Sequence, residues 1–424
     1  GEVYTSFTFL AASGWAYANG AAAFYILCYG TVGFILGYFM VPAIWRVGKE
    51  RGLLTAPDFF AFRYDNRLLG RVLGIFYFFT IVPYVALQLT GIQILLTLAG
   101  YGAYNPATAV VVALLLTTVF VFTAGLRGTA WASVIKDILV LAAVIFAGVA
   151  IPVHFFGSPA AVFSRLAEAK PQWLTLQTVG LHTPAWFVST VILNGVGFFM
   201  GPHSIAAVYA ARDENTLRRN MIFLPFYQVV LLLVFFAGFA ALLIVPGLKG
   251  AAVDQSFMLV VQRFYPAWVL GLVAGAGCLA ALVPVSAQLL GAASALSKNL
   301  VGDIAGWKAE DPANTLCARI LIVVLAVLAL AFWRAHIELG ELLLLYYNFI
   351  TQMLPGFVFG LVWKRANAWG VSAGIAAGLC TALWLALAGV SWFGLNVGLI
   401  GLIVNIGVCV AVTLLTTQNE KARS

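Results

Sequence analysis

The sequence predicts an all-α protein that crosses a membrane many times. Hydrophobic residues make up 63% of the 424 residues and charged residues only 9%, whereas soluble domains contain roughly 25% charged residues. The mean hydropathy is +1.00. The apolar residues form helix-length segments, and short loops between them carry most of the charges. We therefore expect residues 1–424 to form a single transmembrane domain.

The apolar segments can be assigned in order along the chain. The first, residues 5–18, is too short to cross a hydrocarbon layer of roughly 30 Å, so we interpret it as half of a helix that ends at Asn19-Gly20. Eleven longer segments follow, which we interpret as spans. They are residues 21–47, 69–99, 107–124, 130–156, 185–200, 221–245, 268–296, 316–332, 342–363, 371–388 and 393–415.

Lys and Arg residues concentrate on alternate loops, as they do on the cytoplasmic side of membrane proteins. With the loop after residue 47 placed in the cytoplasm, all but five of the 23 Lys and Arg residues lie on the inner side. The five on the outer side are Arg165, Lys170, Lys249, Arg263 and Arg334. This pattern predicts a multi-pass protein of the inner cell membrane with a cytoplasmic C-terminus. The net charge of +8 is explained by the Lys and Arg residues of the inner loops, so it does not indicate a nucleic-acid partner.

Proline and glycine interrupt several predicted spans, at Pro83, between Gly195 and Pro202, at Pro284 and at Pro355. A broken helix frees backbone groups, and this is tolerated where they face protein, water or a bound solute. The first and sixth segments are both broken and lie five segments apart. Two inverted five-helix repeats, each with a broken leading helix, would produce this spacing, which is typical of transporters.

Four segments resemble the sodium/solute symporter family. Residues 55–64, TAPDFFAFRY, are similar to its T-x-P-E-F-L-x-x-R-Y cytoplasmic motif, and residues 125–131, GLRGTAW, to its G-G-L-x-A-V-x-W element. Residues 201–213 resemble the Q-P-H segment of its sixth helix, with the following A-x-K-D, and residues 288–296 resemble its eighth-helix run S-Q-L-L with the following S-A-L.

The resemblance implies the leucine-transporter fold, in which two inverted five-helix repeats and peripheral helices surround a central site that opens alternately to each side. In that frame a leading helix and the inner half of the first core helix would precede Gly1. The resemblance also implies two short outer helices, at residues 165–177 and 252–263, where the polarity of the sequence is mixed.

The chain departs from the family where relatives bind sodium. They use backbone carbonyls at the first-helix break and two adjacent hydroxyl residues in the eighth helix. Those two positions correspond here to Val283 and Pro284, or to Pro284 and Val285 if the register is shifted by one residue, with Ser286 nearby. The family's acidic residue on the fifth helix corresponds to Ser133. Hard oxygen ligands suit a small cation, so we do not expect the usual sodium site.

Lys136 stands one helical turn beyond Ser133, on the same face. A lysine at the centre of a membrane helix costs roughly 2.5 to 3.5 kcal/mol unless it finds a partner or the interface, which suggests a function. Resemblance to proton-coupled members of the wider superfold implies that its ammonium replaces sodium and carries the proton. The alternative is that Lys136 extends to the inner interface and only sets topology. The other candidates for ion coupling are Gly1, Glu2, Tyr4, Ser133 and Ser286, with Glu2 a rival proton site.

Polar side chains near the expected centre are the candidates for solute contact. Tyr84 and Gln88 are four residues apart and share a helix face, as do Tyr4 and Thr8. The full set is Tyr4, Thr5, Thr8, Tyr84, Gln88, Asn194, Tyr347 and Asn348. Hydrogen bonding between helices is the alternative role for each. The positive end of the broken first helix suits a carboxylate, and the altered sodium positions resemble the monocarboxylate-permease branch of the family, so we expect a small monocarboxylate.

We therefore expect a secondary active transporter that imports a small organic solute with an ion, a proton in preference to sodium. It would act in the lipid bilayer as a monomer and without a cofactor. The alternatives are a sodium-coupled symporter of an amino acid or sugar, a channel and a solute-sensing membrane domain. No repeated filter sequence or ring of like charges favours a channel. The four histidines are scattered without an acid or cysteine at ligand spacing, so we expect neither a metal site nor an enzyme.

Overall fold

The computed structural model describes residues 4–421. Within that range, the side chains of residues 124–127, 129–130 and 417–421 are not described. Gly1 and Glu2, two of the candidates for ion coupling, lie outside the described residues.

In the described chain, ten helical segments are long and apolar enough to cross a membrane. An eleventh segment consists of two shorter helices, α9 (Pro184–Gly197) and α10 (Pro202–Ala210), which meet the same criteria together and are bent by 43° relative to each other. These segments coincide with the eleven predicted spans, the first of them continuous with the half-helix before it.

The helices of the N-terminal part follow the apolar segments closely. The 3₁₀ and π elements are labelled η. The elements are η1 (Phe7–Ala11), α1 (Ala12–Asn19), η2 (Gly20–Phe24), α2 (Tyr25–Arg51), α3 (Ala56–Arg63), α4 (Arg67–Thr80), α5 (Val82–Ala99), α6 (Pro106–Ile145), η3 (Phe146–Ala150) and α7 (Ile151–Phe156). The helix α6 covers two predicted spans. The first is Pro106–Thr123. The second is Trp131–Phe156, which includes the end of α6, η3 and α7.

The remaining elements combine long spans with shorter helices and turns. They are α8 (Pro159–Ala169), η4 (Pro171–Leu174), α9, α10, α11 (Glu214–Gln228), α12 (Leu231–Ile244), η5 (Gly250–Gln255), α13 (Ser256–Phe264), α14 (Ala267–Leu296), η6 (Ser297–Gly302), α15 (Asp303–Ala305), α16 (Pro312–Trp333), α17 (Leu339–Ile350), η7 (Thr351–Met353), α18 (Leu354–Val362), α19 (Ala368–Ala388), η8 (Trp392–Gly394) and α20 (Val397–Lys421). The first outer helix begins earlier than residue 165, because Ser158 accepts a hydrogen bond from Ala161 N and caps α8.

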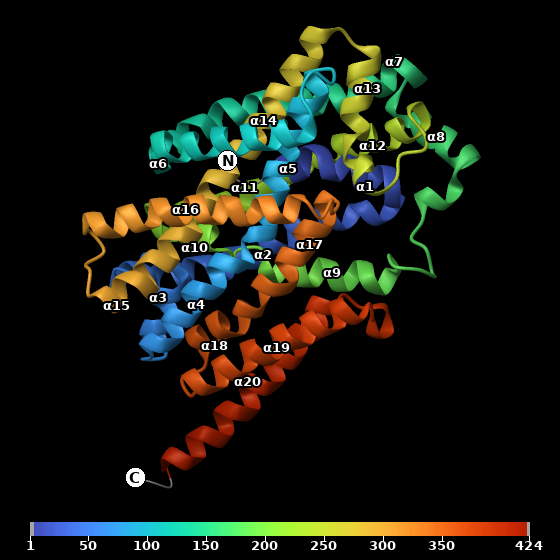
Figure 1. The fold of residues 1–424 in the computed structure, drawn as a ribbon. Helices are drawn as coiled ribbons and strands as arrows, with labels where there is room; N and C mark the ends of the chain where they lie inside the picture. Colours follow the sequence, from blue (N-terminus) through green and yellow to red (C-terminus); the bar gives the residue numbers. More distant parts are fainter. Residues whose placement is uncertain (1–3, 422–424) are drawn as a thin grey trace.

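The first half-helix lies inside the bundle, where η1 and α1 pack against α5, α12 and α17. Its predicted end is confirmed, because Gly20 turns the chain with a φ of 56° and a Cβ there would clash with the backbone of Trp173. The long helix α14 contacts α5, α6, α10 and α16. The pair α19 and α20 packs together at one edge of the molecule, where α20 extends towards the C-terminus (Figure 1).

Three of the four predicted helix interruptions are present. Pro83 lies in the first turn of α5, Pro355 in the first turn of α18, and the sixth span breaks between α9 and α10. The interruption predicted at Pro284 is wrong, because α14 continues through this residue from Ala267 to Leu296. Proline removes one backbone donor, and neighbouring helices and side chains can accommodate that loss within a packed membrane bundle.

Candidate functional site

The described chain begins at Tyr4, just before the first helical element, η1. The Tyr4 hydroxyl donates a hydrogen bond to the Tyr227 carbonyl at 2.8 Å, and the two rings meet edge to face at 4.4 Å between centroids. Phe7 N donates to Thr5 Oγ1 at 3.1 Å, and Thr5 N donates to Thr8 Oγ1 at 3.4 Å. The two threonine hydroxyls therefore help to satisfy the backbone where the helix starts.

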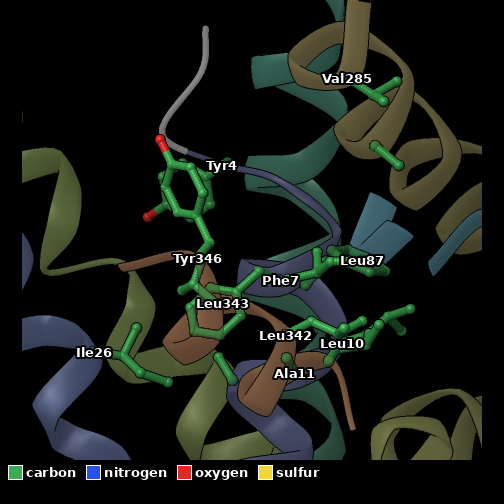
Figure 2. Close-up of a cluster of buried hydrophobic side chains, with 14 of the residues drawn as sticks. Tyr4, Phe7, Leu10, Ala11, Ile26, Leu87, Val285, Leu342, Leu343 and Tyr346 are labelled. Atoms are coloured by element: carbon green, nitrogen blue, oxygen red, sulfur yellow. The ribbon is translucent and has the colours of Figure 1, made fainter. Parts of the chain in front are cut away.

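Figure 2 shows how this start is held inside the apolar core. Tyr4 and Phe7 belong to the same cluster of buried hydrophobic side chains as Leu343 and Tyr346 of α17. The side chains of Tyr4 and Phe7 are 2% and 3% exposed. Apolar packing thus fixes the position of the Tyr4 backbone carbonyl, which is the group that the next contact uses.

Lys136 extends from α6 to this start. Its Nζ donates a hydrogen bond to the Tyr4 carbonyl oxygen at 3.0 Å and lies 3.0 Å from Asp137 Oδ1. The Lys136 side chain is fully buried, whereas the Asp137 side chain is 32% exposed. The ammonium therefore lies at a first-helix carbonyl, as the hypothesis of a sodium surrogate requires. The alternative, in which Lys136 extends to the inner interface, does not fit its complete burial. Its role in coupling stays a prediction.

The eighth span supplies few oxygen ligands near this region. Val283 and Pro284 are buried and carry no side-chain oxygen. Ser286 is also buried, and its hydroxyl donates to the Val283 carbonyl of its own helix at 2.7 Å. Ser133, on α6, is half-buried. The eighth span therefore lacks the two adjacent hydroxyl groups of the usual sodium site, and the hydroxyl of the nearby Ser286 already bonds the backbone.

The two residues predicted to share a face of α5 have different neighbours. Gln88 Oε1 accepts hydrogen bonds from Ser6 Oγ at 2.6 Å and Ser6 N at 3.2 Å, which ties α5 to the first helix. The centroid of the Tyr84 ring lies 4.9 Å from that of Tyr346 and 6.0 Å from that of His203. Tyr84 therefore lies near the break of the sixth span, and Gln88 lies at the start of the first.

Several buried amide groups have no hydrogen-bond partner among the described residues. Asn194 of α9 is fully buried, and neither its Oδ1 nor its Nδ2 has a partner among the described residues. Gln88 Nε2 and Asn348 Oδ1 are likewise unpaired in that part of the chain. Tyr347 packs against Tyr29 at 5.5 Å. An unpaired buried amide costs about 1 to 3 kcal/mol, so these groups suit a polar solute or water.

A polar network at the predicted inner side was not anticipated. Lys298 Nζ donates to both carboxylate oxygens of Asp58 at 2.6 Å, Asn299 Nδ2 donates to Asp58 Oδ1 at 2.6 Å, and Thr55 Oγ1 donates to Asn299 Oδ1 at 2.6 Å. Burial raises the pKa of Asp58, but Lys298 and these hydrogen bonds outweigh it and hold the pKa below its usual value. The T-x-x-D pattern of the capping box could have indicated that Asp58 is structural.

Comparison with known proteins extends these observations. The family model "Sodium:solute symporter family" matches residues 2–378. The uncharacterized symporter YhjB of Bacillus subtilis is 37% identical over 100% of this chain and 88% of its own length. A second one, YodF of the same organism, is 30% identical over 89% of this chain and 76% of its own. The monocarboxylate transport permease protein of Rhizobium johnstonii is 27% identical over 100% of this chain and 88% of its own.

Two solved structures share the fold. A sodium-coupled sialic acid symporter, in a substrate-bound outward-open state, has a TM-score of 0.77 at 18% identity and covers 98% of this chain and 87% of its own. Mhp1 in an inward-facing conformation has a TM-score of 0.56 at 15% identity and covers 99% of this chain and 89% of its own. The predicted leucine-transporter fold is confirmed, and it is a fold of membrane transporters and not of enzymes. The chain therefore belongs to the sodium:solute symporter family and is a multi-pass secondary symporter of a small-molecule substrate.

Proposed function

We propose that this symporter couples solute uptake to protons and not to sodium, and that Lys136 is the coupling group. The observation that carries the proposal is the 3.0 Å hydrogen bond from Lys136 Nζ to the Tyr4 carbonyl. A positive charge at this carbonyl takes the place of an alkali ion at the broken helix. Two positive charges this close would repel each other strongly in a region of low dielectric constant, so the ammonium and a sodium ion exclude each other.

Protonation of Lys136 changes a contact between two helices. The charged form is stabilised by the Tyr4 carbonyl and the Asp137 carboxylate, whereas full burial disfavours charge. Loss of the proton therefore weakens the link between α6 and the start of the first helix. Alternating access requires such helices to shift relative to each other, and a proton that binds one arrangement more tightly can drive the shift.

For the solute we propose a small monocarboxylate. The positive end of the first helix suits a carboxylate, and two unpaired amide donors, Asn194 Nδ2 and Gln88 Nε2, can donate to its oxygens. The name of the monocarboxylate permease from Rhizobium johnstonii points to the same class. Counterflow with lactate, pyruvate, alanine and a neutral sugar tests this proposal. A preference for lactate or pyruvate supports it, and a preference for the sugar or alanine overturns it.

Uptake into proteoliposomes with proton and sodium gradients imposed separately tests the coupling. We expect accumulation when the outside is acidic, and no requirement for sodium. Lys136→Ala and Lys136→Arg should both abolish pH-driven accumulation, because the first carries no proton and the second does not release one. Both should retain counterflow. The control Lys249→Ala, at an exposed position on the predicted outer side, should behave as wild type. Strict sodium dependence at constant pH, or unchanged coupling in Lys136→Ala, contradicts the proposal.

A sodium-coupled symporter of an amino acid or sugar is the second candidate. It is favoured by relatives such as the sodium/proline symporter of Salmonella typhimurium, which is 25% identical over 83% of this chain and 72% of its own.

We further propose that the protein acts as a monomer in the inner cell membrane, with its C-terminus in the cytoplasm. Labelling of a cysteine placed at Ser424 by an impermeant reagent tests the orientation, since intact cells should protect it.

A further inference from the structure

One buried carboxyl group lies at the predicted outer side, where three segments that are far apart in the sequence meet. Asp254 lies in η5, and its Oδ2 accepts a hydrogen bond from Leu339 N, at the start of α17, at 2.9 Å. Its other oxygen, Oδ1, has no hydrogen-bond partner among the described residues. Asp254 is only 1% exposed. A carboxylate in this position would have exchanged its hydration for a single hydrogen bond.

The backbone of the first helix forms the opposite wall. A Cβ on Gly14 would lie 2.8 Å from Asp254 Oδ1 and 3.0 Å from the carbonyl oxygen of Val253, so η5 packs directly on α1. A cavity of about 160 Å³ adjoins Asp254, and its lining includes Ile94 and His336. Ile94 is 5% exposed. We call this arrangement, with η5 held against α1 and α17, the closed state.

The charged groups around Asp254 do not compensate it. No Lys or Arg of the described chain lies within ion-pair distance of its carboxyl group, and the acids Glu338 and Glu341 flank the start of α17. His336 lines the cavity, Tyr17 of α1 donates its hydroxyl to Val245 O, and α13 carries Arg263 near its C-terminal end. Burial raises the pKa of Asp254 to about 7, and Glu338 adds to this, while the Leu339 hydrogen bond opposes it.

We propose that the contact of η5 with α1 and α17 is an outer gate and that Asp254 is its proton site. The carboxyl group of Asp254 is neutral when it is buried between α1 and α17. When η5 separates from these helices, the group becomes hydrated and ionises with an ordinary pKa of about 4. A proton from the outer solution therefore binds the closed state more tightly than the open state and favours closure. The site regulates opening on the outer side and is separate from coupling at Lys136.

The expected size follows from the difference in proton affinity between the two states. Above pH 7 the closed and open states are both ionised, and pH has little effect on their ratio. Below pH 7 the closed state binds a proton that the open state lacks, so the ratio of closed to open molecules rises up to about tenfold for each pH unit. From pH 8 to pH 6 this gives a change of roughly tenfold in total.

Cysteine labelling from the outside tests the proposal. Ile94→Cys would report on the cavity beside Asp254, in a background without the five native cysteines. Val179→Cys, at a site that is 86% exposed, corrects for the pH dependence of the impermeant maleimide. We expect the corrected labelling of Ile94→Cys to fall roughly tenfold from pH 8 to pH 6. In combination with Asp254→Asn, which imitates the neutral acid, labelling should be low at both pH values.

If Asp254→Asn does not reach the membrane, a second variant tests the proposal. Glu338→Gln removes a neighbouring negative charge, so the midpoint of the labelling curve should move to lower pH. Glu168→Gln, an exposed acid on α8, should leave the curve unchanged. The proposal is overturned by a flat wild-type curve, by a wild-type curve in Asp254→Asn, or by an unmoved midpoint in Glu338→Gln. Lys136→Ala should retain the wild-type curve, so this outcome is independent of the coupling proposal.

Discussion

The two ends of the helix bundle hold buried acids in opposite ways. At the predicted inner end, Asp58 forms an ion pair with Lys298 and accepts further hydrogen bonds from Thr55 N, just before α3, and from Asn299 of η6, and its pKa is lowered. At the outer end, Asp254 accepts one backbone hydrogen bond and faces another acid, and its pKa is raised to about 7. The inner acid is therefore buried as a carboxylate with its own counter-ion, whereas the outer acid has no counter-ion among the described residues and titrates near neutral pH.

This difference separates a fixed contact from a titratable one. Further ion pairs lie at the predicted inner end, among them Arg46 with Glu214 at 2.8 Å and Arg71 with Asp303 at 2.6 Å. They are partly exposed, and such pairs contribute at most about 1 kcal/mol each. The Asp58 network is thus the main polar contact at the predicted inner end. The buried contact of Asp254 is its counterpart at the predicted outer end.

The largest effect should come from Asp58→Asn. The change leaves Lys298 without its counter-ion and removes an acceptor for Leu54 N and Thr55 N. Breaking a buried pair costs about 3 to 5 kcal/mol, and we expect about 3 kcal/mol because the Lys298 side chain is 29% exposed. Thermal unfolding in detergent measures this. Asp303→Asn, in a more exposed pair, is the control and should cost less than about 1 kcal/mol; equal losses in the two variants would contradict the comparison.

Gly14→Ala tests the outer contact in the same way. The added methyl group would meet Asp254 Oδ1 and the Val253 carbonyl, so we expect η5 to be displaced at a cost of about 2 kcal/mol. Labelling of Ile94→Cys should then be high at pH 8 and at pH 6. In Gly271→Ala no atom lies within 4 Å of the new Cβ, so this variant should retain the wild-type profile. Low labelling in Gly14→Ala at pH 6 would mean that η5 does not close the cavity.

A smaller effect is expected from Thr55→Ala. The variant loses the cap on Asp58 N and the hydrogen bond to Asn299, for which we expect about 1 kcal/mol. Thr183→Ala removes only the corresponding cap of α9, on Trp186 N, at the other end of the bundle, and should cost no more than Thr55→Ala. The two variants should differ in accessibility, since only Thr55→Ala should increase labelling of cysteines from the inner side.

Most of the fold could be predicted because apolar length and helix-breaking residues act locally. The half-helix before Gly20, the starts of α5 and α18 and the bent sixth span all follow from such signals. Pro284 shows the limit of this reasoning. A proline predicts a break only when nothing else supports the helix, and the packing of α14 among α5, α6 and α16 is not visible in the sequence.

The site was only partly predictable. Lys136 could be identified because an ionisable residue inside an apolar segment needs a partner, and the structure provides one at the Tyr4 carbonyl. Helix periodicity placed Tyr84 and Gln88 on one face but could not assign their different neighbours, His203 and Ser6. Asp254 gave no signal, since its burial results from the packing of η5 on a glycine far away in the sequence.

The smallest effect, and the sharpest test of the comparison, is the absence of a pH response at the inner end. The pKa of Asp58 is lowered, so its stabilising contribution is present above the ordinary value of about 4 and is lost only as the pH falls through the lowered pKa. In a Lys136→Ala background, which removes the proposed coupling proton, labelling of an inner cysteine at Phe62, which is 42% exposed, should therefore be constant between pH 5 and pH 8 after correction for the reagent. Over the same interval the outer cysteine at Ile94 should respond. A parallel response at both ends would mean that one conformational equilibrium controls them, and that the two acids do not act as separate contacts.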